Sequence, residues 1–427
     1  MWWKETGVVL AMSDRTNRYE DHLKVLGVTQ ALADSCDLDE LLGIIVAQSL
    51  DLLEAEQVSL LLYDQKHREL YSKIATGGQE MRFSIDKGIA GACARELVTV
   101  HVPDAYDDAR FNRDMDVQAG FRTRNILAVP LRDFEGRLVG VLQVFNKRQG
   151  SFTVEDISLA ESLGAQAGVA LQRAMLLEHF VAKQQMERSL AIARDIQQGL
   201  FPKSAPQLAG WDLAGWNRPA EETGGDTYDF FELGRDRLGM LLADATGHGI
   251  GPALVIAQTR AMVRALAQHE ANIQPLMATV NNLLVADLAN ERFVTCFFGV
   301  LHGGIGTLKY LSAGQGPMLV YRAASDTFQT SSATGVPLGI LPDVEFDHLV
   351  TLDLQPGDFF ALTTDGFFEA TNAEGEEFGI PRVLDHLRAH RHEPAQQMLS
   401  NLTAAVDKFC GSKAQGDDLT AIIAKRV

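Results

Sequence analysis

Two aspartates bracket a predicted β-hairpin near the middle of the chain. Asp226 opens an aromatic run, Asp244 closes an aliphatic one, and a polar Gly-Arg-Asp-Arg turn lies between the two runs. Two such runs joined by a short turn predict antiparallel strands. If the turn is centred on Arg235, the two aspartates are equally far from it and face each other across the strands. Because neighbouring carboxylates repel each other unless a cation lies between them, this hairpin is a candidate metal site.

Two more aspartates stand at predicted strand ends in the C-terminal part of the chain. Asp365 follows the apolar run 359–362 in the sequence Leu-Thr-Thr-Asp-Gly, and Asp417 precedes a predicted terminal strand in Gly-Asp-Asp-Leu-Thr. Carboxylates beside glycine at strand ends lie at the rim of a sheet, where a hard cation can take several oxygen ligands. Asp418 is an alternative to Asp417 as the ligand. The GxxxxGK(S/T) phosphate-binding loop has no match in the sequence.

Composition limits the classes of protein to which the chain can belong. Its 427 residues exceed one ordinary core and predict two or three domains, and 46% hydrophobic with 22% charged residues is typical of globular domains. A formal charge of −18 argues against nucleic acid or an anionic membrane as the main partner. No apolar window approaches the ~20 residues of a membrane helix. The four cysteines have neither zinc nor disulfide spacing, so we expect a cytoplasmic protein with reduced thiols.

The N-terminal part of the chain predicts a compact α/β domain. Residues 1–19 are expected to form a leader, and apolar residues recur at helical spacing from Asp21. Strand-like runs separated by Gly, Asp and Arg turns follow at 57–63, 69–75, 98–102, 124–131 and 137–146. Helices before and after these strands predict a sheet flanked by helices, which ends near residue 175.

Several motifs in this region resemble a GAF domain, expected over residues 20–175. They are Ile-Asp-Lys-Gly-Ile-Ala-Gly at 85–91, Asp-Ala-Arg-Phe-Asn at 108–112, Gly-Phe-Arg-Thr-Arg-Asn-Ile-Leu at 120–127, and Asn146-Lys147 with Phe152 and Asp156. The last set is similar to the signature of the GAF domains that regulate cyclic-nucleotide phosphodiesterases and cyclases, although Ile157 replaces its glutamate.

The resemblance implies a ligand pocket associated with the four signature residues, of which the lysine and aspartate brace the pocket rather than touch the ligand. A cyclic nucleotide (cAMP or cGMP), another small ligand, and a purely structural or dimerising module remain open as its role.

Residues 157–200 predict one long helix that contains no proline. Apolar positions alternate steps of four and three as in a coiled coil, and this seam changes phase after Val181. The first part comprises Leu163, Ala167, Ala170, Ala174, Leu177 and Val181, and the second comprises Met186, Leu190, Ala193, Gln197 and Leu200. We expect this helix to pair with its copy in a parallel homodimer. The change of phase would then be the place where the supercoil of the two helices can change. The alternative is that half of the helix packs on its own domain.

The helix is expected to end at Gly199 and Pro202, in Ala-Arg-Asp-Ile-Gln-Gln-Gly-Leu-Phe-Pro. This segment resembles the entry of SpoIIE/RsbU-like phosphatases of the metal-dependent PPM (PP2C-like) class, and the likeness extends over residues 193–427. It includes the four acids in the order GGD, DxxGHG, TTDG and DDxT. It implies an α-β-β-α sandwich for residues 201–427 and hence an α/β multidomain chain.

The same resemblance implies a site for two Mn²⁺ or Mg²⁺ ions. Asp244 would bridge the ions with the Ala245 carbonyl beside it, Asp226 would serve one ion, and Asp365 and Asp417 the other. Two such cations activate a water for in-line attack on phosphorus and offset the charge on the phosphoryl oxygens, so no phospho-enzyme is expected.

Five other residues near these motifs also bear on the expected chemistry. His248 lies four residues past Asp244. In the larger PP2C enzymes, by contrast, a histidine directly follows an Asp-Gly pair. We expect His248 either to act as a general acid or to shape the start of the next helix. Gln315 stands in Ser-Ala-Gly-Gln-Gly-Pro where relatives have Asn-Ala-Gly-His. Arg218 is a candidate phosphate contact, Asp229 is expected to support the ligands, and Glu369 to lie on a helix surface.

The function that these resemblances imply is a phosphatase acting on phosphoserine or phosphothreonine of a bacterial signalling protein. The usual substrate in the family is a phosphorylated anti-sigma-factor antagonist of the STAS type, and the GAF domain would control the enzyme through the dimeric helix. The alternative is a ligand-binding signalling scaffold with an inactive, phosphatase-like docking domain. Cyclic-nucleotide hydrolysis is excluded because the histidine and aspartate clusters of a phosphodiesterase domain are missing.

Overall fold

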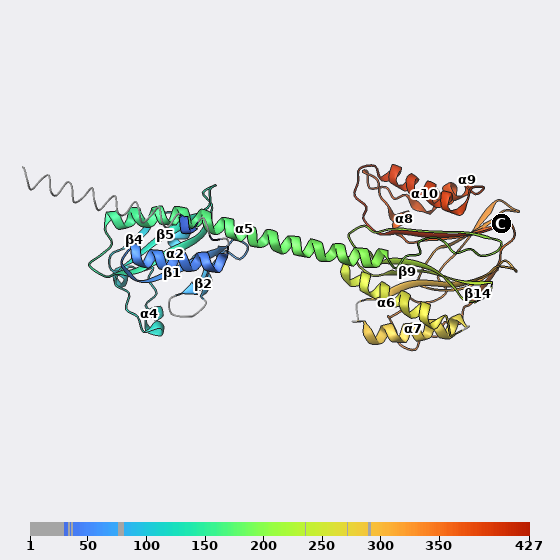
Figure 1. Ribbon diagram of the computed structural model, residues 1–427, viewed down its shortest axis with the longest axis horizontal. Helices are drawn as coiled ribbons and strands as arrows, with labels where there is room; N and C mark the ends of the chain where they lie inside the picture. Colours follow the sequence, from blue (N-terminus) through green and yellow to red (C-terminus); the bar gives the residue numbers. More distant parts are fainter. Residues whose placement is uncertain are drawn as a thin grey trace, which may run out of the picture. The chain divides into compact units, whose positions relative to one another are not determined.

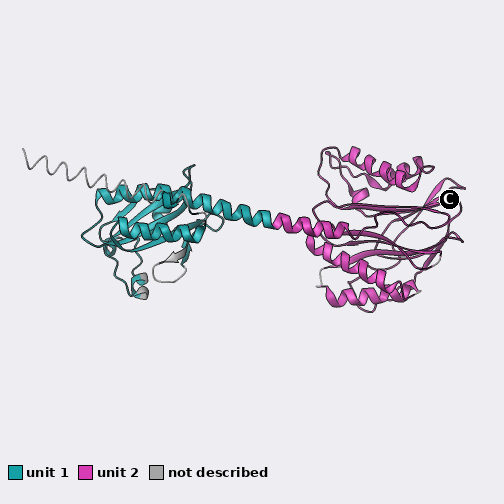
Figure 2. Ribbon diagram, in the orientation of Figure 1, with its two compact units in different colours: residues 1–185 teal, residues 186–427 magenta. Residues whose placement is uncertain are grey.

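The computed structural model describes residues 30–32, 35, 37–75, 81–234, 236–270, 272–288 and 292–427. The expected leader and the start of the helical pattern at Asp21 lie outside these residues. The chain divides into two compact units, residues 1–185 and 186–427 (Figure 2). Helix α5 (Val154–Gln198) continues from the first unit into the second (Figure 1). In the described part of the chain, no helix combines the length and apolar character needed to cross a bilayer.

The first unit is built on an antiparallel six-stranded sheet with the order β3-β2-β1-β6-β5-β4. Its strands are β1 (Ala55–Asp64), β2 (Glu69–Ala75), β3 (Arg82–Ser84), β4 (Val100–Val102), β5 (Ile126–Arg132) and β6 (Leu138–Lys147). The five predicted strands are confirmed, and β3 is a short additional one. Two short helices, α3 (Gly88–Glu96) and α4 (Arg113–Ala119), and the turn η1 (Ala105–Asp107) also lack a counterpart in the sequence prediction.

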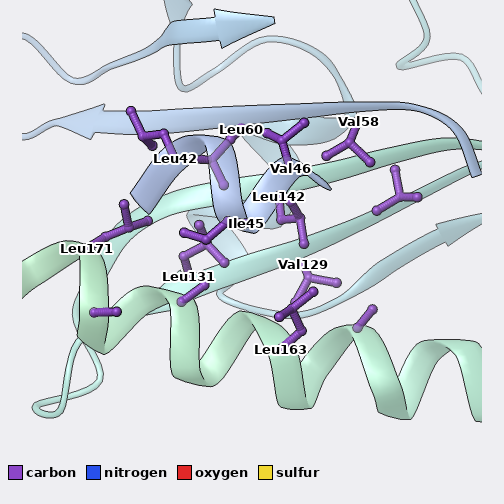
Figure 3. Close-up of a cluster of buried hydrophobic side chains, with 14 of the residues drawn as sticks. Leu42, Ile45, Val46, Val58, Leu60, Val129, Leu131, Leu142, Leu163 and Leu171 are labelled. Carbon is purple, nitrogen blue, oxygen red and sulfur yellow. The ribbon is translucent and has the colours of Figure 1, made fainter. Parts of the chain in front are cut away.

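Helices cover both faces of this sheet. On one face α2 (Leu38–Leu52) and the first half of α5 pack against β1, β5 and β6, and Figure 3 shows this cluster. On the other face α3 contributes Ile89, Ala90 and Cys93 to a second cluster. Glycines in α5 permit close packing, since a Cβ at Gly168 would lie 2.2 Å from the Arg132 carbonyl oxygen. The first unit is therefore a helix-flanked sheet, as the sequence predicted.

The first half of the predicted coiled-coil seam belongs to the core of this unit. Four seam positions are at most 9% exposed and pack in the cluster of Figure 3, namely Leu163, Ala167, Ala170 and Ala174. They cannot face a second helix because the sheet already covers them. Leu177 and Val181, in contrast, are 40% and 51% exposed. The continuous coiled coil is thus not confirmed, and the alternative holds for residues 163–174.

Past Val181 the seam meets the second unit. Leu190, Ala193 and Gln197 are half-buried, whereas the residues between them are exposed. The Gln197 side chain donates from Nε2 to the Gly224 carbonyl at 2.7 Å and accepts from the Gly224 N–H at 3.1 Å. The phase change after Val181 therefore separates two faces of α5, one packed on the first unit and one directed to the second.

The second unit is a sandwich of two five-stranded sheets. One sheet has the order β14-β11-β10-β9-β8 and the other β13-β12-β15-β16-β7. The strands are β7 (Trp211–Arg218), β8 (Asp226–Glu232), β9 (Arg237–Ala245), β10 (Val294–His302), β11 (Thr307–Ala313), β12 (Met318–Arg322), β13 (Thr327–Ser331), β14 (Val350–Asp353), β15 (Phe359–Thr363) and β16 (Leu419–Arg426). Aromatic side chains of both sheets, such as Phe297 and Phe360 with ring centroids 5.2 Å apart, fill the space between them.

Helices form the outer layers of the sandwich (Figure 1). The outer face of β8–β11 packs with α6 (Ile250–Leu266) and α7 (Ile273–Asp287). The outer face of the other sheet packs with α8 (Gly366–Glu369), α9 (Gly379–Ala389) and α10 (Ala395–Cys410). The layers follow the α-β-β-α order that the sequence implied.

Candidate functional site

The hairpin of β8 and β9 brings the first two acids together. In the antiparallel register Asp226 is the direct partner of Asp244, and this confirms the prediction from the turn position. On the other side of β9, Asp244 pairs with Thr295 and Ala245 with Val294 of β10. Asp226 is only 2% exposed, whereas Asp244 is partly open.

The acids of the second sheet lie at the same end of the sandwich. Asp365 follows β15, and Asp417 and Asp418 precede β16, which is paired with β15. Thr364 Oγ1 donates to Asp226 Oδ2 at 2.9 Å, and the Asp226 N–H donates to Asp418 Oδ2 at 3.2 Å. These two contacts join the sheets directly at the acids. The four predicted aspartates therefore come together at one site, although they lie far apart in the sequence.

Glycine is required where the segments that carry the acids approach one another. A Cβ at Gly224 would lie 2.3 Å from Asp418 Oδ2, and a Cβ at Gly366 would lie 2.1 Å from the Asp418 carbonyl oxygen. Real Cβ atoms are not found at such distances, so any larger residue would push the segments apart. The glycines beside the acids in the sequence motifs thus have a packing reason.

Burial and mutual repulsion disfavour the ionised form of these carboxyls. Burial first, then Asp365, Asp417 and Asp418, raise the pKa of Asp244 to about 7. Burial first, then Asp244 and Asp418, raise the pKa of Asp226 well above its usual range. Burial is also the largest cause of the raised pKa values of Asp365 and Asp418. The carboxyls that raise these pKa values come from both sheets, so negative charge is concentrated at this end of the sandwich.

This donor set fits hard divalent cations, which take carboxylate and carbonyl oxygens. Within the described residues, however, no three His, Cys, Asp or Glu side chains have the arrangement of a closed metal site. Part of the reason is that some carboxylates accept protein hydrogen bonds: Asp418 accepts from the backbone N–H groups of Ala220 and Asp226. Asp417 is exposed and accepts only a local bond from the Asp418 N–H. The oxygens of Asp418 thus accept bonds from distant backbone groups, whereas Asp417 accepts one from its neighbour.

Gln315 connects the two sheets behind the acids. Its side chain accepts from Thr295 Oγ1 at 2.6 Å, and Thr295 is the strand partner of Asp244. From Nε2 it donates to the Thr363 carbonyl at 3.3 Å, two residues before Asp365. Gln315 is 4% exposed, so it cannot exchange these partners for water at little cost. The sequence left its role undefined, and the structure shows a link between Thr295 of β10, the strand next to that of Asp244, and the end of β15, which precedes Asp365.

His248 and Arg218 occupy the margins of the site. The His248 side chain is 84% exposed and lies 3.1 Å from Glu221 through Nδ1. Arg218 donates to both carboxylate oxygens of Asp407, at 2.6 and 3.0 Å, and from Nε to Gln415 at 2.7 Å. Three of its five N–H donors are therefore used within the protein.

Asp229 has a different role from the one that the sequence suggested. Its side chain is 1% exposed and pairs with Arg260 at 2.9 Å and with Arg264 at 2.7 Å. Both arginines lie on α6, so Asp229 fastens this helix to β8. Glu369 is exposed on α8, as expected. Sequence reasoning missed Thr364 and Gln197, although Thr364 stands inside the Thr-Thr-Asp-Gly motif and could have been found there.

The signature residues of the first unit hold the fold of its sheet. Lys147 Nζ lies 2.9 Å from Asp156 Oδ1, and Phe152 is 4% exposed in the core. Asn146 accepts from the Arg124 N–H and donates to the Arg122 carbonyl. None of the four signature residues lines the cavity of about 450 Å³ in this unit. Its lining includes Arg82, Phe83, Lys87, Arg110, Asn112, Gln143 and Phe145.

Comparisons with known proteins agree with this division of the chain. The family model described as Stage II sporulation protein E (SpoIIE) matches residues 234–427, and the GAF domain model matches residues 37–171. The chain is 26% identical over 260 residues to Protein IcfG of a Synechocystis species, with 55% of this chain and 40% of IcfG covered. It is 33% identical over 151 residues to the probable 3',5'-cyclic phosphodiesterase pde-5 of Caenorhabditis elegans, with 32% of this chain and 21% of that protein covered. It thus spans less than half the length of either relative.

A solved structure supports the fold of the second unit. The SiaA-PP2C domain of Pseudomonas aeruginosa superposes with a TM-score of 0.51 at 22% identity, with 58% of this chain and 98% of that chain covered. Residues 37–171 therefore match the GAF domain model and residues 234–427 the SpoIIE model, and the second unit has the fold of a PP2C domain.

Proposed function

We propose that the second unit is a metal-dependent phosphatase that hydrolyses phosphoserine or phosphothreonine on a protein. One observation carries the proposal: carboxylates from both sheets meet at one end of a PP2C-type sandwich, where they raise one another's pKa values. A site of this kind favours divalent cations, and phosphate esters are substrates that divalent cations activate.

Mn²⁺ or Mg²⁺ ions would be held by Asp226, Asp244, the Ala245 carbonyl, Asp365 and Asp417, with Asp244 shared between two of them. When bound, they would activate a water for in-line attack and offset the charge on the phosphoryl oxygens. The protein's own contribution is to fix the ligands. Thr364 orients Asp226, and Gln315 links β10, the neighbour of the strand that carries Asp244, to the end of β15 before Asp365.

A peptide panel tests the reaction and its specificity. With saturating Mn²⁺, the full chain should release phosphate from phosphoserine and phosphothreonine peptides, and release should stop when EDTA is added. Release from phosphotyrosine peptides alone would contradict the proposed specificity. No release from any peptide would favour the alternative, a signalling scaffold with an inactive phosphatase-like domain.

The protein substrate that we propose is a phosphorylated antagonist of the STAS type, in a bacterial partner-switching pathway. The match to the SpoIIE family supports this choice. A purified phosphorylated STAS protein should lose its phosphate faster than a peptide cut from it, because a folded partner offers more contact surface. Equal rates for the protein and the peptide would count against a dedicated protein substrate.

We further propose that the GAF domain controls the phosphatase through α5 in a parallel homodimer. The support is a set of exposed apolar residues in the middle of α5, at Leu176, Leu177, Phe180, Val181 and Met186. A second copy of the helix could cover them. The dimer seam is thereby limited to the middle of the helix, since its first part is already buried.

Gln197 provides the contact through which α5 can act on the metal acids, because its partner Gly224 lies two residues before Asp226. Gln197→Ala should lower kcat roughly 5- to 30-fold, since two hydrogen bonds are worth about 1 kcal/mol each. The exposed neighbour gives a matched control, Gln198→Ala, which should keep wild-type kcat. Equal kcat values for the two variants would show that the helix end does not control the site.

A small ligand such as cAMP or cGMP is proposed for the GAF domain. The cavity of about 450 Å³ supports this, because it combines aromatic side chains with the cationic Lys87, Arg82 and Arg110. Calorimetry with cAMP and with cGMP should show binding of one of them, and phosphatase activity should change in its presence. If neither cAMP nor cGMP gives a heat of binding, the GAF domain binds another ligand or has a purely structural role.

A further inference from the structure

Two polar side chains, those of Ser59 and Gln143, lie on the sheet of the first unit where it borders the cavity of about 450 Å³. They are direct partners in the antiparallel register of β1 and β6, so their side chains stand side by side on one face. The neighbouring residues Val58, Leu60 and Leu142 point to the other face, which α2 and α5 cover (Figure 3). Because successive side chains of a strand alternate between faces, Ser59 and Gln143 point toward the face of α3 and the cavity.

The Gln143 amide is buried and has no partner in the protein. Gln143 is 9% exposed and Ser59 3%, and neither side chain forms a hydrogen bond within the described part of the chain. Neither contributes an atom to the buried polar groups that lack both a partner and access to open space, so their polar atoms border the cavity. Gln315, in contrast, spends both ends of its amide on Thr295 and Thr363. Natural proteins rarely keep a buried amide without partners unless a bound group supplies them.

Two of the cations that line the same cavity are already paired. Arg82 donates to Glu69 at 2.9 Å, and Arg110 donates to both carboxylate oxygens of Asp108 at 2.9 and 2.6 Å. These guanidinium groups therefore spend several of their donors on the protein. The Gln143 amide, which makes no such bond, keeps its two donors and its acceptor for a ligand.

We propose that Gln143 determines the specificity of this cavity, by pairing with a planar heterocycle that carries an N–H donor next to an acceptor, as nucleobases do. The amide presents a donor and an acceptor in one plane, so it can form two parallel hydrogen bonds with such an edge. The aromatic side chains of Phe83, Phe111 and Phe145 line the same cavity and offer apolar surface to the flat faces of the ring. The inference rests on the small-ligand function proposed above for the GAF domain.

Nucleosides with and without this edge test the pairing by calorimetry on the full chain. Adenosine has the edge, and purine riboside lacks its amino group; guanosine has the edge, and 1-methylguanosine lacks its ring N–H. Within at least one pair, the wild type should bind the first nucleoside roughly 5- to 100-fold more tightly, the discrimination expected for a bidentate contact. Gln143→Leu replaces the amide by an apolar group of similar size, and this ratio of affinities should fall to about one.

The ratio separates recognition from damage to the fold, because a disturbed cavity would weaken both members of a pair. Gln143→Met repeats the test with an unbranched side chain. Without nucleoside, the melting temperature of either variant should equal or exceed that of the wild type, since a buried amide without a partner is removed. Gln172→Leu is the matched control: its glutamine bonds Asp133, outside the cavity lining, and the variant should keep the wild-type ratio.

Two results would overturn the proposal: the same ratio in the wild type and in both Gln143 variants, or no binding of any of the four nucleosides to the wild type. The same titrations with cAMP and cGMP test the proposed function separately. Binding of a nucleoside but of neither cyclic nucleotide would sink the cyclic-nucleotide proposal and support the role of Gln143. Binding of cAMP or cGMP with affinity unchanged in both Gln143 variants would do the reverse.

Discussion

Asp244→Asn should reduce phosphate release from phosphopeptides by roughly 1000-fold or more, because metal-assisted charge stabilisation is worth several kcal/mol. Asp244 is placed to be shared by both cations, since its strand faces Asp226 and its pKa responds to Asp365 and Asp417. An amide is a weaker ligand and carries no charge to hold a second ion. Calorimetric titration with Mn²⁺ should accordingly show weaker binding. Wild-type activity in this variant would remove Asp244 from the metal site.

The same variant should be more stable than the wild type when metal is absent. The pKa of Asp244 is raised from 3.8 to about 7, so its carboxyl contributes stability in full below about pH 4 and loses this contribution as the pH rises through 7. Asparagine stays neutral at every pH and avoids the loss. In EDTA, the melting temperature of the variant should exceed that of the wild type at pH 8 and match it more closely at pH 5. The opposite order at pH 8 would mean that the carboxylates are not crowded in solution.

Asp229→Ala should lower the free energy of unfolding by about 3–5 kcal/mol, the cost of removing one partner from a buried ion pair. The Asp229 side chain is 1% exposed, and the Arg260 side chain that it binds is 13% exposed. Burial already lowers the pKa of Arg260, and its Nε lacks a partner in the described chain. Without Asp229, this arginine would be a half-buried charge, and α6 would lose its ties to β8.

Urea unfolding measures this effect, and the surface offers a matched comparison. Glu376→Ala breaks the exposed pair with Arg382, which keeps its bonds to the Glu377 and Phe378 carbonyls, and should cost no more than about 1 kcal/mol. Similar unfolding free energies for the two variants would show that the Asp229 pair does not fasten α6. Because α6 begins five residues after Ala245, we also expect weaker Mn²⁺ binding in Asp229→Ala.

Local patterns were sufficient to predict the hairpin and five of the six strands of the first sheet. The turn between β8 and β9 fixes their register, and so Asp226 could be placed opposite Asp244 without a structure. The long helix was also predicted, within three residues at each end. Strand β3 was missed because a segment of three residues has too few positions to show an alternation.

The role of the apolar stripe on α5 could not be decided in this way. A spacing of three and four residues places side chains on one helix face, but it does not say whether that face meets a second helix or a sheet. Here Leu163 and Ala167 meet the sheet. The two glycines of this stretch, Gly164 and Gly168, were the sequence signal for packing on a sheet. They allow α5 to lie close to β5.

The contacts between distant segments were also beyond reach. Thr364 lies 138 residues from the Asp226 that it binds, and Gln315 connects Thr295 of β10 to Thr363 of β15, which belong to different sheets. Asp229 appeared to be one more acid near the metal ligands, because the arginines that neutralise it stand on the next helix. Such pairings depend on how the two sheets pack, which no local pattern records.

Manganese-dependent hydrolysis by the full chain tests the central claim most directly. Phosphate release from a phosphoserine peptide would be measured during Mn²⁺ titration for the wild type and for Asp244→Asn. We predict release by the wild type that saturates with Mn²⁺, disappears with EDTA, and is absent in the variant at every Mn²⁺ concentration. Wild-type protein that binds Mn²⁺ but releases no phosphate, or a variant as active as the wild type, would contradict the account.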